Sequence, residues 1–527
     1  MSWKIAQRVR QGARRVSAGV LTLAICGCAG VWGVDRGEAL GRHAVVAGGE
    51  AGEYFRQMRP PFRGFSAEDE RLLEAVSLGA WRTLWEQVDP DSGLVYDRTS
   101  GTVVSVAGVG FQLASLPIGV ERGWVGRAEA EARAVRVLRS LREGKGNRKA
   151  GLYFHFLEGD GSASAREFEM TVSTVDSAIL FAGACVAASA FGGEVAALAE
   201  AMFAEADWTF FVDHEVEADW AKGGVSLGWQ PADAGDPTGE GTLLGYHWLD
   251  AACEARLVVF MGMSTPVEQH RLAPEAYWRL RRPVGEHSGE AIVFNPYAGA
   301  LFTQQYAHLF IDYASMGADD PGAHGFERVR VDWWENSRRF AAMHRERTLA
   351  AAGRSKTFAA GLWGLSASDT PGGYAVAGLH PKRVRIPGDR EGWDDPGHEP
   401  VDEWGDGTVS LSAAVGTVLF EPGPAMALLR RAMALRGSDG ALLAWSDPAE
   451  GGRGLSNAVN LGGAEPWAAP DRLAIDDGSL LLAIENARTG LVWRLFHRHP
   501  AVRGGMERLG LEGSEAEGQW GREAEWK

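Results

Sequence analysis

Helical spacing of apolar residues dominates this sequence from Ser66 to about residue 496. The stretch that begins at Ser66 shows the pattern in full: a serine suited to cap a helix, acids in the next turn, and apolar residues every three or four positions. The same spacing predicts helices over about 66–88, 107–117, 127–142, 174–191, 194–211, 247–262, 299–315, 329–351, 408–419, 422–436 and 478–496. Convincing alternating strands are few. The chain is therefore expected to be all-α.

Successive helices joined by long loops fit a bundle, a solenoid or a toroid of helical hairpins. No repeat of fixed period is visible, which argues against the solenoid. In a toroid the loops at one end converge on a central cleft, a geometry that suits an extended polymer. We expect one large domain over residues 66–510, followed by a disordered polar tail at 511–527.

The charge balance excludes one class of ligand. The chain carries 53 basic and 69 acidic residues, a formal net charge of -16. Nucleic-acid binding depends on phosphate neutralisation by Lys and Arg, so a nucleic acid is not an expected partner. A neutral ligand fits better, and the 20 Trp residues are compatible with sugar binding, although most Trp residues simply pack in cores.

The first residues have the pattern of an export signal. Basic residues precede the apolar run "VSAGVLTLAICGCAG", which is shorter than the ~20 residues that span a bilayer. The run resembles a bacterial lipoprotein signal over residues 1–28, with Cys28 as the lipidated residue; Cys26, or ordinary cleavage after small residues, is the alternative. A linker at 29–65 would follow. We expect an exported protein, periplasmic or anchored to the membrane through this lipid alone.

Metal and cofactor motifs are missing from the sequence. Cys185 and Cys253 lie in apolar helical runs and are expected to be small buried residues. There is no zinc spacing, no H-E-x-x-H, no G-x-S-x-G, and no strand followed by G-x-G-x-x-G. The sequence therefore predicts neither a metal site nor a cofactor.

Two acidic pairs are the first candidates for chemistry. Asp250 and Glu254 are four residues apart in an apolar segment; on one helix face their repulsion and burial would raise a carboxyl pKa, as a general acid requires. The alternative is a solvated stripe, with Glu254 paired to an arginine such as Arg279. Asp476 and Asp477 stand just before a helix, where the helix dipole favours the ionised form, and one of them could simply cap that helix. One neutral and one ionised acid is the arrangement used in glycoside hydrolysis.

Three further segments carry polar residues of interest. "LFTQQYAHLFIDY" at 301–313 places His308 and Asp312 one turn apart, so Asp312 could orient the imidazole, or His308 could be a core histidine. Asp97 and Arg98 form either a structural ion pair or donors and acceptors for sugar hydroxyls. "WGLSASDTPGGY" at 363–374 reads as a Pro-Gly-Gly turn flanked by aromatic residues.

Taken together, these segments resemble the bacterial glucoamylase-like domain family over about residues 66–510. The motifs that carry the resemblance are "DPDSGLVYDRTS", "GVGFQLASLPIGVERGWVGRAEA", "STVDSAILFAG", "GWQP", "EARLVVFMGMSTP", "LFTQQYAHLFIDY", "WWENSRR", "WGLSASDTPGGY", "DGTVSLSAAVGTVLFEP" and "LAIDDGSLLLAIENARTGLVWRLF". The characterised branch of this family is the family 144 endo-β-1,2-glucanases, and a related domain occurs in cyclic β-1,2-glucan synthases.

The resemblance implies a fold and a set of roles. The fold would be an (α/α)6 toroid, and the activity an inverting, endo-acting cleavage of β-glucan, most simply β-1,2-glucan. Glu254 would be the acid and Asp476 the base, roughly 6.5–9.5 Å apart unless water or a substrate hydroxyl relays the proton. The implied substrate-binding residues are Asp97, Arg98, Asp176, Trp229, Gln305, His308, Trp363, Asp369, Tyr374, Asp406 and Trp467.

The sequence departs from the family pattern at several of these segments. Thr171 stands where members often have an acid, with Glu169 displaced by two positions, and Gln304 and Asn457 replace a His and an Asp. "DDGS" replaces "DQGP". Exo action, another linkage, or glycan binding without cleavage by a surface lipoprotein are the alternatives. A lyase acting on uronic acids would prefer a cationic site, which the acidic balance disfavours.

Overall fold

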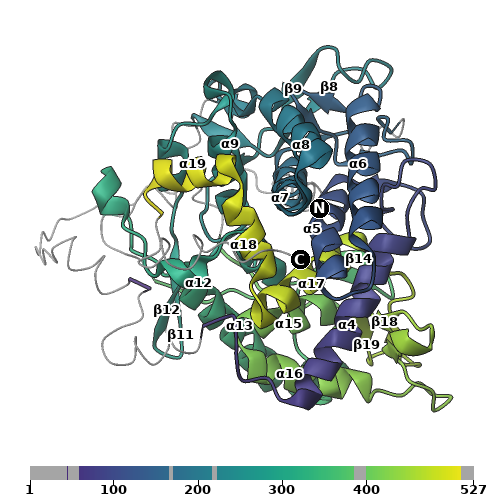
Figure 1. Ribbon diagram of the computed structural model, residues 1–527. Coiled ribbons are helices and arrows are strands. Elements are labelled where there is room, and N and C mark those ends of the chain that lie inside the picture. The colour runs from purple at the N-terminus through teal and green to yellow at the C-terminus, as the bar shows by residue number, and fades with distance from the viewer. Residues whose placement is uncertain (1–43, 46–58, 165–169, 217–221, 385–398, 512–527) are drawn as a thin grey trace, which may run out of the picture.

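The computed structural model describes residues 44–45, 59–164, 170–216, 222–384 and 399–511 (Figure 1). The predicted signal at 1–28 with Cys28, most of the predicted linker, Glu169 and the tail from 512 onward lie outside the described residues.

Six helical segments of the described chain form a closed inner ring. Each contacts the next in chain order, and the last contacts the first. The members are α5 (Val106–Glu121), α7 (Thr174–Phe191), α9 (Ala255–Ser264), the 3-10 turn η4 (Leu301–Gln304) with α11 (Tyr306–Phe310), α15 (Leu411–Gly416) and α17 (Ala474–Arg488).

A second set of helices packs outside this ring. Most of these outer helices, among them α4, α6, α8, α10, α13 and α16, contact an inner segment near them in sequence, so that the chain alternates between the two layers. The outer helices are α4 (Ala67–Glu86), α6 (Arg127–Glu143), α8 (Gly193–Glu205), α10 (Glu275–Trp278), α12 (Tyr313–Met316), α13 (Trp333–Ala350), α14 (Lys356–Ala359) and α16 (Pro422–Met433). After α17 the chain continues through α18 (Leu491–Arg498), which contacts α5, α7, α11 and α17, and α19 (Pro500–Leu509), which contacts α9.

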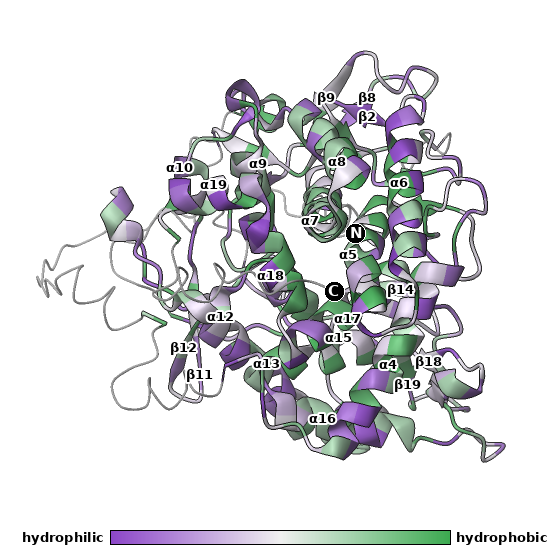
Figure 2. Cartoon of the chain, in the orientation of Figure 1, coloured by the Kyte–Doolittle hydropathy of each residue, from purple (hydrophilic) through white to green (hydrophobic). Residues whose placement is uncertain are grey.

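Burial explains the composition of the inner layer. Nearly every residue of α7 is buried, and Figure 2 shows this helix mostly hydrophobic, whereas outer helices such as α16 are mixed. Among the described residues, α7 is the one helix long and apolar enough to cross a membrane, with 94% of that window buried inside the protein. We interpret α7 as a core helix, since its apolar surface is already covered.

Two glycines allow α5 and α7 to approach closely. A Cβ built on Gly183 would lie 1.9 Å from the carbonyl oxygen of Gly110, and one on Gly110 would lie 2.4 Å from that of Ile179. No side chain fits between the two backbones. This contact fixes the spacing of two neighbouring inner helices.

Short antiparallel strands precede several inner helices. Ser105, Ser173 and Ser410 each end a strand and cap the following helix through the side chain. The pairs are β1 (Val104–Ser105) with β4 (Phe156–Leu157), β2 (Arg148–Lys149) with β3 (Leu152–Tyr153), β5 (Val172–Ser173) with β8 (Gly228–Pro231), β8 with β9 (Gly241–Leu243), β7 (Gly224–Ser226) with β6 (Val212–Asp213) and β10 (His247–Trp248), β11 (Val284–His287) with β12 (Glu290–Val293) and β15 (Lys382–Arg383), β13 (Ala367–Thr370) with β14 (Gly373–Val376), β16 (Val409–Ser410) with β19 (Ala458–Asn460), β19 with β20 (Trp467–Ala468), and β17 (Trp445–Ser446) with β18 (Gly454–Leu455).

Several predicted helices differ from the observed ones. The segment 247–262 begins as β10 and becomes helical only at Ala255, and the segment 299–315 is broken into η4, α11 and α12. The helix expected at 478–496 begins at Ala474 and breaks at Gly490, a residue in the left-handed conformation that glycine favours. The helix α19 was not predicted.

The last hairpin packs against the first. Helix α17 contacts both α4 and α5. Arg488 of α17 donates to Glu70 and Glu74 of α4 at 2.8 and 2.9 Å, and Arg122, just after α5, donates to the fully buried Glu485 at 2.6 Å. These contacts close the ring between segments more than 360 residues apart.

Candidate active site

The first turns of the inner helices meet at one end of the ring. Gln305, just before α11, donates through Nε2 to the carbonyl of Ala413 in α15 at 2.7 Å. A Cβ built on Gly108 in α5 would lie 3.0 Å from the Cβ of Ala474, the first residue of α17. The inner helices therefore run parallel, and their N-terminal ends share the end of the ring where the candidate acids lie.

Glu254 occupies the residue directly before α9. Its side chain is partly buried, and burial, followed by the charge of Asp176, raises its pKa to about 8. Within the described part of the chain the carboxyl has no hydrogen bond or ion pair. A carboxyl in this state holds its proton at neutral pH and can give it to a bound group.

The predicted pairing of Asp250 with Glu254 on one helix face is wrong. Asp250 lies before the helix, where Arg281 donates to both of its carboxylate oxygens at 3.1 and 2.8 Å. Arg279 instead donates to the backbone carbonyls of Lys222 and Gly223. Desolvation and Asp176, rather than Asp250, keep Glu254 protonated.

Asp476 and Asp477 lie inside the first turn of α17, with different surroundings. Asp477 is fully buried and accepts from Arg472 at 3.0 and 2.5 Å, so its role is structural. Asp476 is 5% exposed, and its Oδ2 has no hydrogen-bond partner. Burial, then repulsion by Asp477, Asp369 and Asp97, raises the pKa of Asp476 well above its ordinary value. The expectation that the helix dipole keeps this acid readily ionised is therefore wrong, since these effects outweigh the dipole.

Arg98 gathers carboxylates from three segments. Its guanidinium lies 3.3 Å from Asp369 on β13, 3.4 Å from Asp471 and 3.6 Å from Asp97. Burial raises the pKa of Asp97 to about 6, against the opposing attraction of Arg98. Tyr374 pairs with Asp369 across the β13–β14 hairpin. The structure thus brings Asp97, Arg98, Asp369, Tyr374 and Asp476 together, with the Pro-Gly-Gly turn of the hairpin beside the acids.

Asp176 brings the first turn of α7 to the same end of the ring. It accepts from the hydroxyl of Ser173, and its Oδ2 lies 3.4 Å from Nδ1 of His155. Burial lowers the pKa of His155 to about 4, so this imidazole is neutral at pH 7. The carboxylate of Asp176 acts on Glu254 across the gap between α7 and α9.

Tyr306 was not singled out from the sequence. It is the first residue of α11, 2% exposed, and its ring packs edge-on against Phe111. Burial, then the charges of Asp476 and Glu254, raises its pKa well above the ordinary value. Both candidate acids therefore lie within electrostatic range of one buried hydroxyl. Its position inside "LFTQQYAHLF" was the available signal, although flanking Gln and His residues drew attention first.

Four predicted binding residues are used inside the protein instead. Gln305 is bonded to Ala413, and His308 is fully buried, bonded to Ser337 at 2.9 Å and packed against rings. Asp312 caps α12 rather than orienting His308. Trp363 and Trp229 are each 2% exposed.

The ring of Trp229 is enclosed in particular by two neighbours. The ammonium of Lys149 lies 4.9 Å from its centroid, and a Cβ on Gly241 would lie 2.3 Å from the ring. The structure therefore does not offer these rings and polar atoms to a sugar, because protein groups already occupy them.

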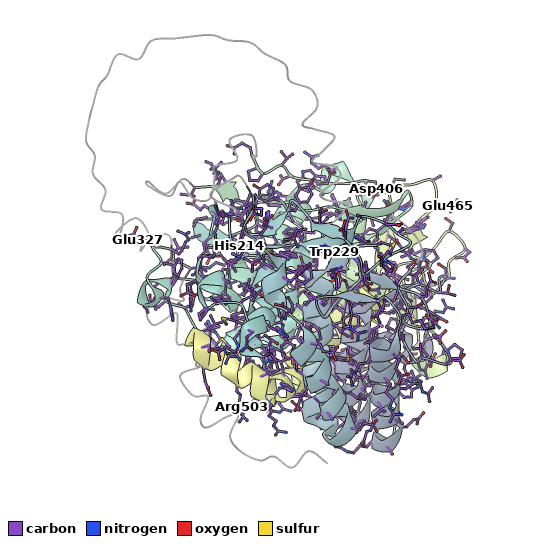
Figure 3. The ribbon with its side chains drawn as sticks, turned by 90° about the horizontal axis from the view of Figure 1, so that it is seen from above. His214, Trp229, Glu327, Asp406, Glu465 and Arg503 are labelled. Carbon is purple, nitrogen blue, oxygen red and sulfur yellow. The ribbon has the colours of Figure 1, made fainter. Side chains whose placement is uncertain are left out.

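Trp467 lies on the neighbouring sheet of β16, β19 and β20, and Asp406 lies in the turn before β16. Asp406 accepts from the backbone and hydroxyl of Thr408, and Trp467 pairs with Asn460 between β19 and β20. This sheet contacts β13, the strand of Asp369. Figure 3 shows Trp229 and Asp406 in the half of the molecule opposite Arg503 of α19.

Two of the residues that depart from the family pattern form hydrogen bonds between segments of the protein. Gln304 donates to the carbonyl of Ala252 at 2.9 Å, two residues before Glu254. The hydroxyl of Thr171 accepts from Gln230 at 2.9 Å. Among the described residues, Cys185 and Cys253 are buried and free, as predicted, and no group of three His, Cys, Asp or Glu residues could hold a metal ion.

Comparisons with known proteins find relatives of similar sequence and fold. A family model for glycoamylase, described as "Putative glucoamylase", matches residues 245–500. A curated relative, an exo β-1,2-glucooligosaccharide sophorohydrolase (non-reducing end) of Parabacteroides distasonis, is 22% identical over 469 residues, which are 84% of this chain. The chain spans 58% of the length of that relative.

Solved structures share the fold. An endo-β-1,2-glucanase of Chitinophaga pinensis, solved with sophorotriose and glucose, superposes with a TM-score of 0.64 and 20% identity over 85% of this chain and 98% of that chain. A β-1,2-glucanase of Parabacteroides distasonis superposes with a TM-score of 0.66 and 19% identity. The match covers 85% of this chain and 60% of that chain. The predicted all-α, (α/α)6 toroid is confirmed by these structures, and residues 245–500 are similar to the glucoamylase family model.

Proposed function

We propose that the protein is an inverting glycoside hydrolase that cleaves β-1,2-linked glucan within the chain. The observation that carries this proposal is the pair of carboxyls with raised pKa, Glu254 and Asp476, at the N-terminal ends of two inner helices. The names of the relatives, a sophorohydrolase and endo-β-1,2-glucanases, support the linkage.

Each acid has one task in this reaction. Glu254 gives its proton to the glycosidic oxygen as the bond from that oxygen to the anomeric carbon breaks. A water attacks the anomeric carbon from the opposite face, and Asp476 takes the proton of that water. The product sugar carries the inverted anomeric configuration, and proton exchange with solvent restores both carboxyls.

The two pKa shifts define the expected pH dependence. Asp476 must be ionised to act as a base, so activity rises as pH passes through its raised pKa. Glu254 must be protonated, so activity falls as pH passes about 8. Because both pKa values are raised, both sides of the pH–activity profile should lie at higher pH than for ordinary carboxyls.

The acid cluster suits a neutral substrate. Asp97, Asp369 and Tyr374 supply acceptors and a hydroxyl for sugar hydroxyl groups, and Arg98 supplies donors held in place by its ion pairs. An anionic chain would be repelled by the surrounding carboxylates.

The test is incubation of the purified protein with a panel of linear glucans, followed by product analysis that includes anomeric configuration. Glu254→Gln and Asp476→Asn should each reduce kcat by at least ~10³-fold while the circular dichroism spectrum is unchanged. Asp477→Asn serves as a comparison, because that acid is structural and its loss should lower stability first. Full activity in the Glu254 and Asp476 variants would contradict the assignment.

One observation favours a second candidate, a glycan-binding protein that does not cleave. The Oδ2 atom of Asp476 is enclosed and has no partner, which limits access of a reacting water. Calorimetry that shows tight binding of β-1,2-glucan, with no product after long incubation, would support this candidate. Product release with inversion would exclude it.

We also propose that the protein is exported and that its lipid anchor is Cys28. The basic and apolar pattern of residues 1–28 supports this. Radiolabelled palmitate should enter the full-length protein expressed in bacteria and not its Cys28→Ser variant. Labelling of both forms would assign the lipid to another residue, and labelling of neither would favour ordinary cleavage.

A further inference from the structure

Asn457 joins the first turns of two inner helices. Its side chain is fully buried, directly before β19. The Oδ1 atom accepts from the backbone N–H of Leu473 at 3.1 Å, while Nδ2 donates to Asp477 Oδ1 at 3.0 Å and to the hydroxyl of Ser412 at 2.8 Å. Its backbone carbonyl accepts from Leu411 at 2.7 Å. One residue thus ties the start of α15 to the start of α17.

The start of α17 depends on this tie because it has no side-chain cap of its own. Leu473 occupies the cap position, and its carbonyl accepts from the N–H groups of both Asp476 and Asp477, at 3.1 and 3.0 Å. Asn457 fixes the peptide of Leu473 from the other side. A displacement of Leu473 would therefore move the backbone that carries Asp476.

The amide also sets the charge around Asp477. Arg472 pairs with both oxygens of Asp477 and donates to the carbonyl of Arg453 at 2.6 Å, so the buried pair is neutral as a whole. The N–H of Asn457 adds a donor to this carboxylate. A carboxylate at position 457 would instead face Asp477 at about the same 3.0 Å, where two like charges repel and a proton must be taken up.

We propose that Asn457 is a positioning residue for Asp476: its amide holds the first turn of α17 in place and sets a neutral donor, rather than a second acid, against Asp477. This inference rests on the proposed function, in which Asp476 is the base. Asn457 touches neither substrate nor water in this role and acts through Leu473 and Asp477.

The test is a set of variants read by pH dependence. Asn457→Asp places a second acid against Asp477, so the rise of kcat/KM with pH should move upward by roughly one unit, with a loss of up to ~10-fold on the acidic side of the profile. Asn457→Ala removes the hydrogen bonds to Leu473 and Asp477 without adding an acid. It should lower kcat, with a smaller shift in the pH dependence of kcat/KM. Asn147→Asp is the matched control: Asn147 is another fully buried asparagine, bonded to Leu141 and Gly161 after α6, so its variant should lose stability without moving the pH dependence.

A second readout needs no catalysis. Because the folded-state pKa of Asp476 is raised, its contribution to stability is present at low pH and is lost as pH rises toward that pKa. Asp476→Asn removes this loss, so the difference in Tm between Asp476→Asn and the parent should grow with pH and then level off. In the Asn457→Asp background the Tm difference should level off at a pH about one unit higher. The double variant Asn457→Asp/Asp477→Asn again has one acid and one amide at these two positions. In this background the Tm difference should level off at the same pH as in the parent.

The outcomes separate the two proposals. If Asn457→Asp moves the Tm titration no more than Asn147→Asp does, the role of Asn457 is overturned. If the titration moves as expected but the parent protein cleaves no glucan, the proposed function fails and the coupling of Asn457 to Asp476 stands.

Discussion

At the scale of single residues, the guanidinium of Arg98 forms ion pairs with three carboxylates. Arg98 lies within 3.3–3.6 Å of Asp97, Asp369 and Asp471, and two of these acids, Asp97 and Asp369, also raise the pKa of Asp476. Two of the acids held by Arg98 thus add to the effects of burial and of Asp477 on the pKa of the proposed base.

Asp369→Asn should therefore shift the acidic side of the pH–activity profile to lower pH. Removing this charge lets Asp476 ionise more easily, and we expect a shift of roughly 0.5–1 unit together with a higher KM. Asp471→Asn is the matched control, because Asp471 contacts Arg98 at a similar distance and is not among the charges that raise the pKa of Asp476. Equal shifts in both variants would mean that Arg98, rather than direct repulsion, sets this titration.

The sequence predicted the titratable residues of the site better than its aromatic ones. Glu254, Asp476 and Asp97 lie in loops or at the start of a helix, and Asp369 lies in a short hairpin, so local sequence marks their positions. Whether a tryptophan such as Trp229 is a sugar platform or a core residue depends on what covers its ring, and that cover comes from Lys149, 80 residues away in the chain. Tyr306 was missed for the same reason, since distant acids define its environment.

At the scale of elements, the packing of α5 on α7 depends on Gly110 and Gly183. Gly183→Ala should lower the free energy of unfolding by roughly 1–3 kcal/mol, because the added methyl would overlap the carbonyl of Gly110 and force the helices apart. Urea unfolding would measure this. Gly423→Ala, in α16 where nothing lies within 4 Å of the new methyl, should be neutral or slightly stabilising, and a similar loss in both variants would contradict the close-contact explanation.

Helices that are buried on all sides were the hardest to bound from the sequence. The segments 299–315 and 478–496 keep apolar residues through the break, so their periodicity shows no interruption. The breaks come from the left-handed Gly490 and from the cap that Asp312 provides to α12. The ends of amphipathic outer helices such as α4 and α6 were predicted to within two residues. Their exposed face is polar, so the alternation of polar and apolar residues shows where each helix begins and ends.

At the scale of the whole molecule, the ring is held closed by charged pairs between its first and last hairpins. Glu485→Ala should cost roughly 2–4 kcal/mol, because it leaves Arg122 without its buried partner. Glu194→Ala, which removes the exposed partner of Arg139, should cost at most about 1 kcal/mol. Thermal unfolding of both variants measures the difference, and similar losses would show that closure does not depend on this pair.

The closure of the ring also has a consequence for how the chain acquires its structure. Arg98 meets Asp471 across 373 positions of sequence, so the candidate site does not exist until the C-terminal hairpin has docked. Contacts of such long separation form late, because the loop entropy must be overcome before they contribute any stability. During synthesis the earlier hairpins are therefore complete before α17 is available. Until α17 docks, the apolar surfaces of α5 and α15 that it covers remain exposed. Refolding rate and aggregation of this protein should accordingly be governed by the arrival of its last hairpin.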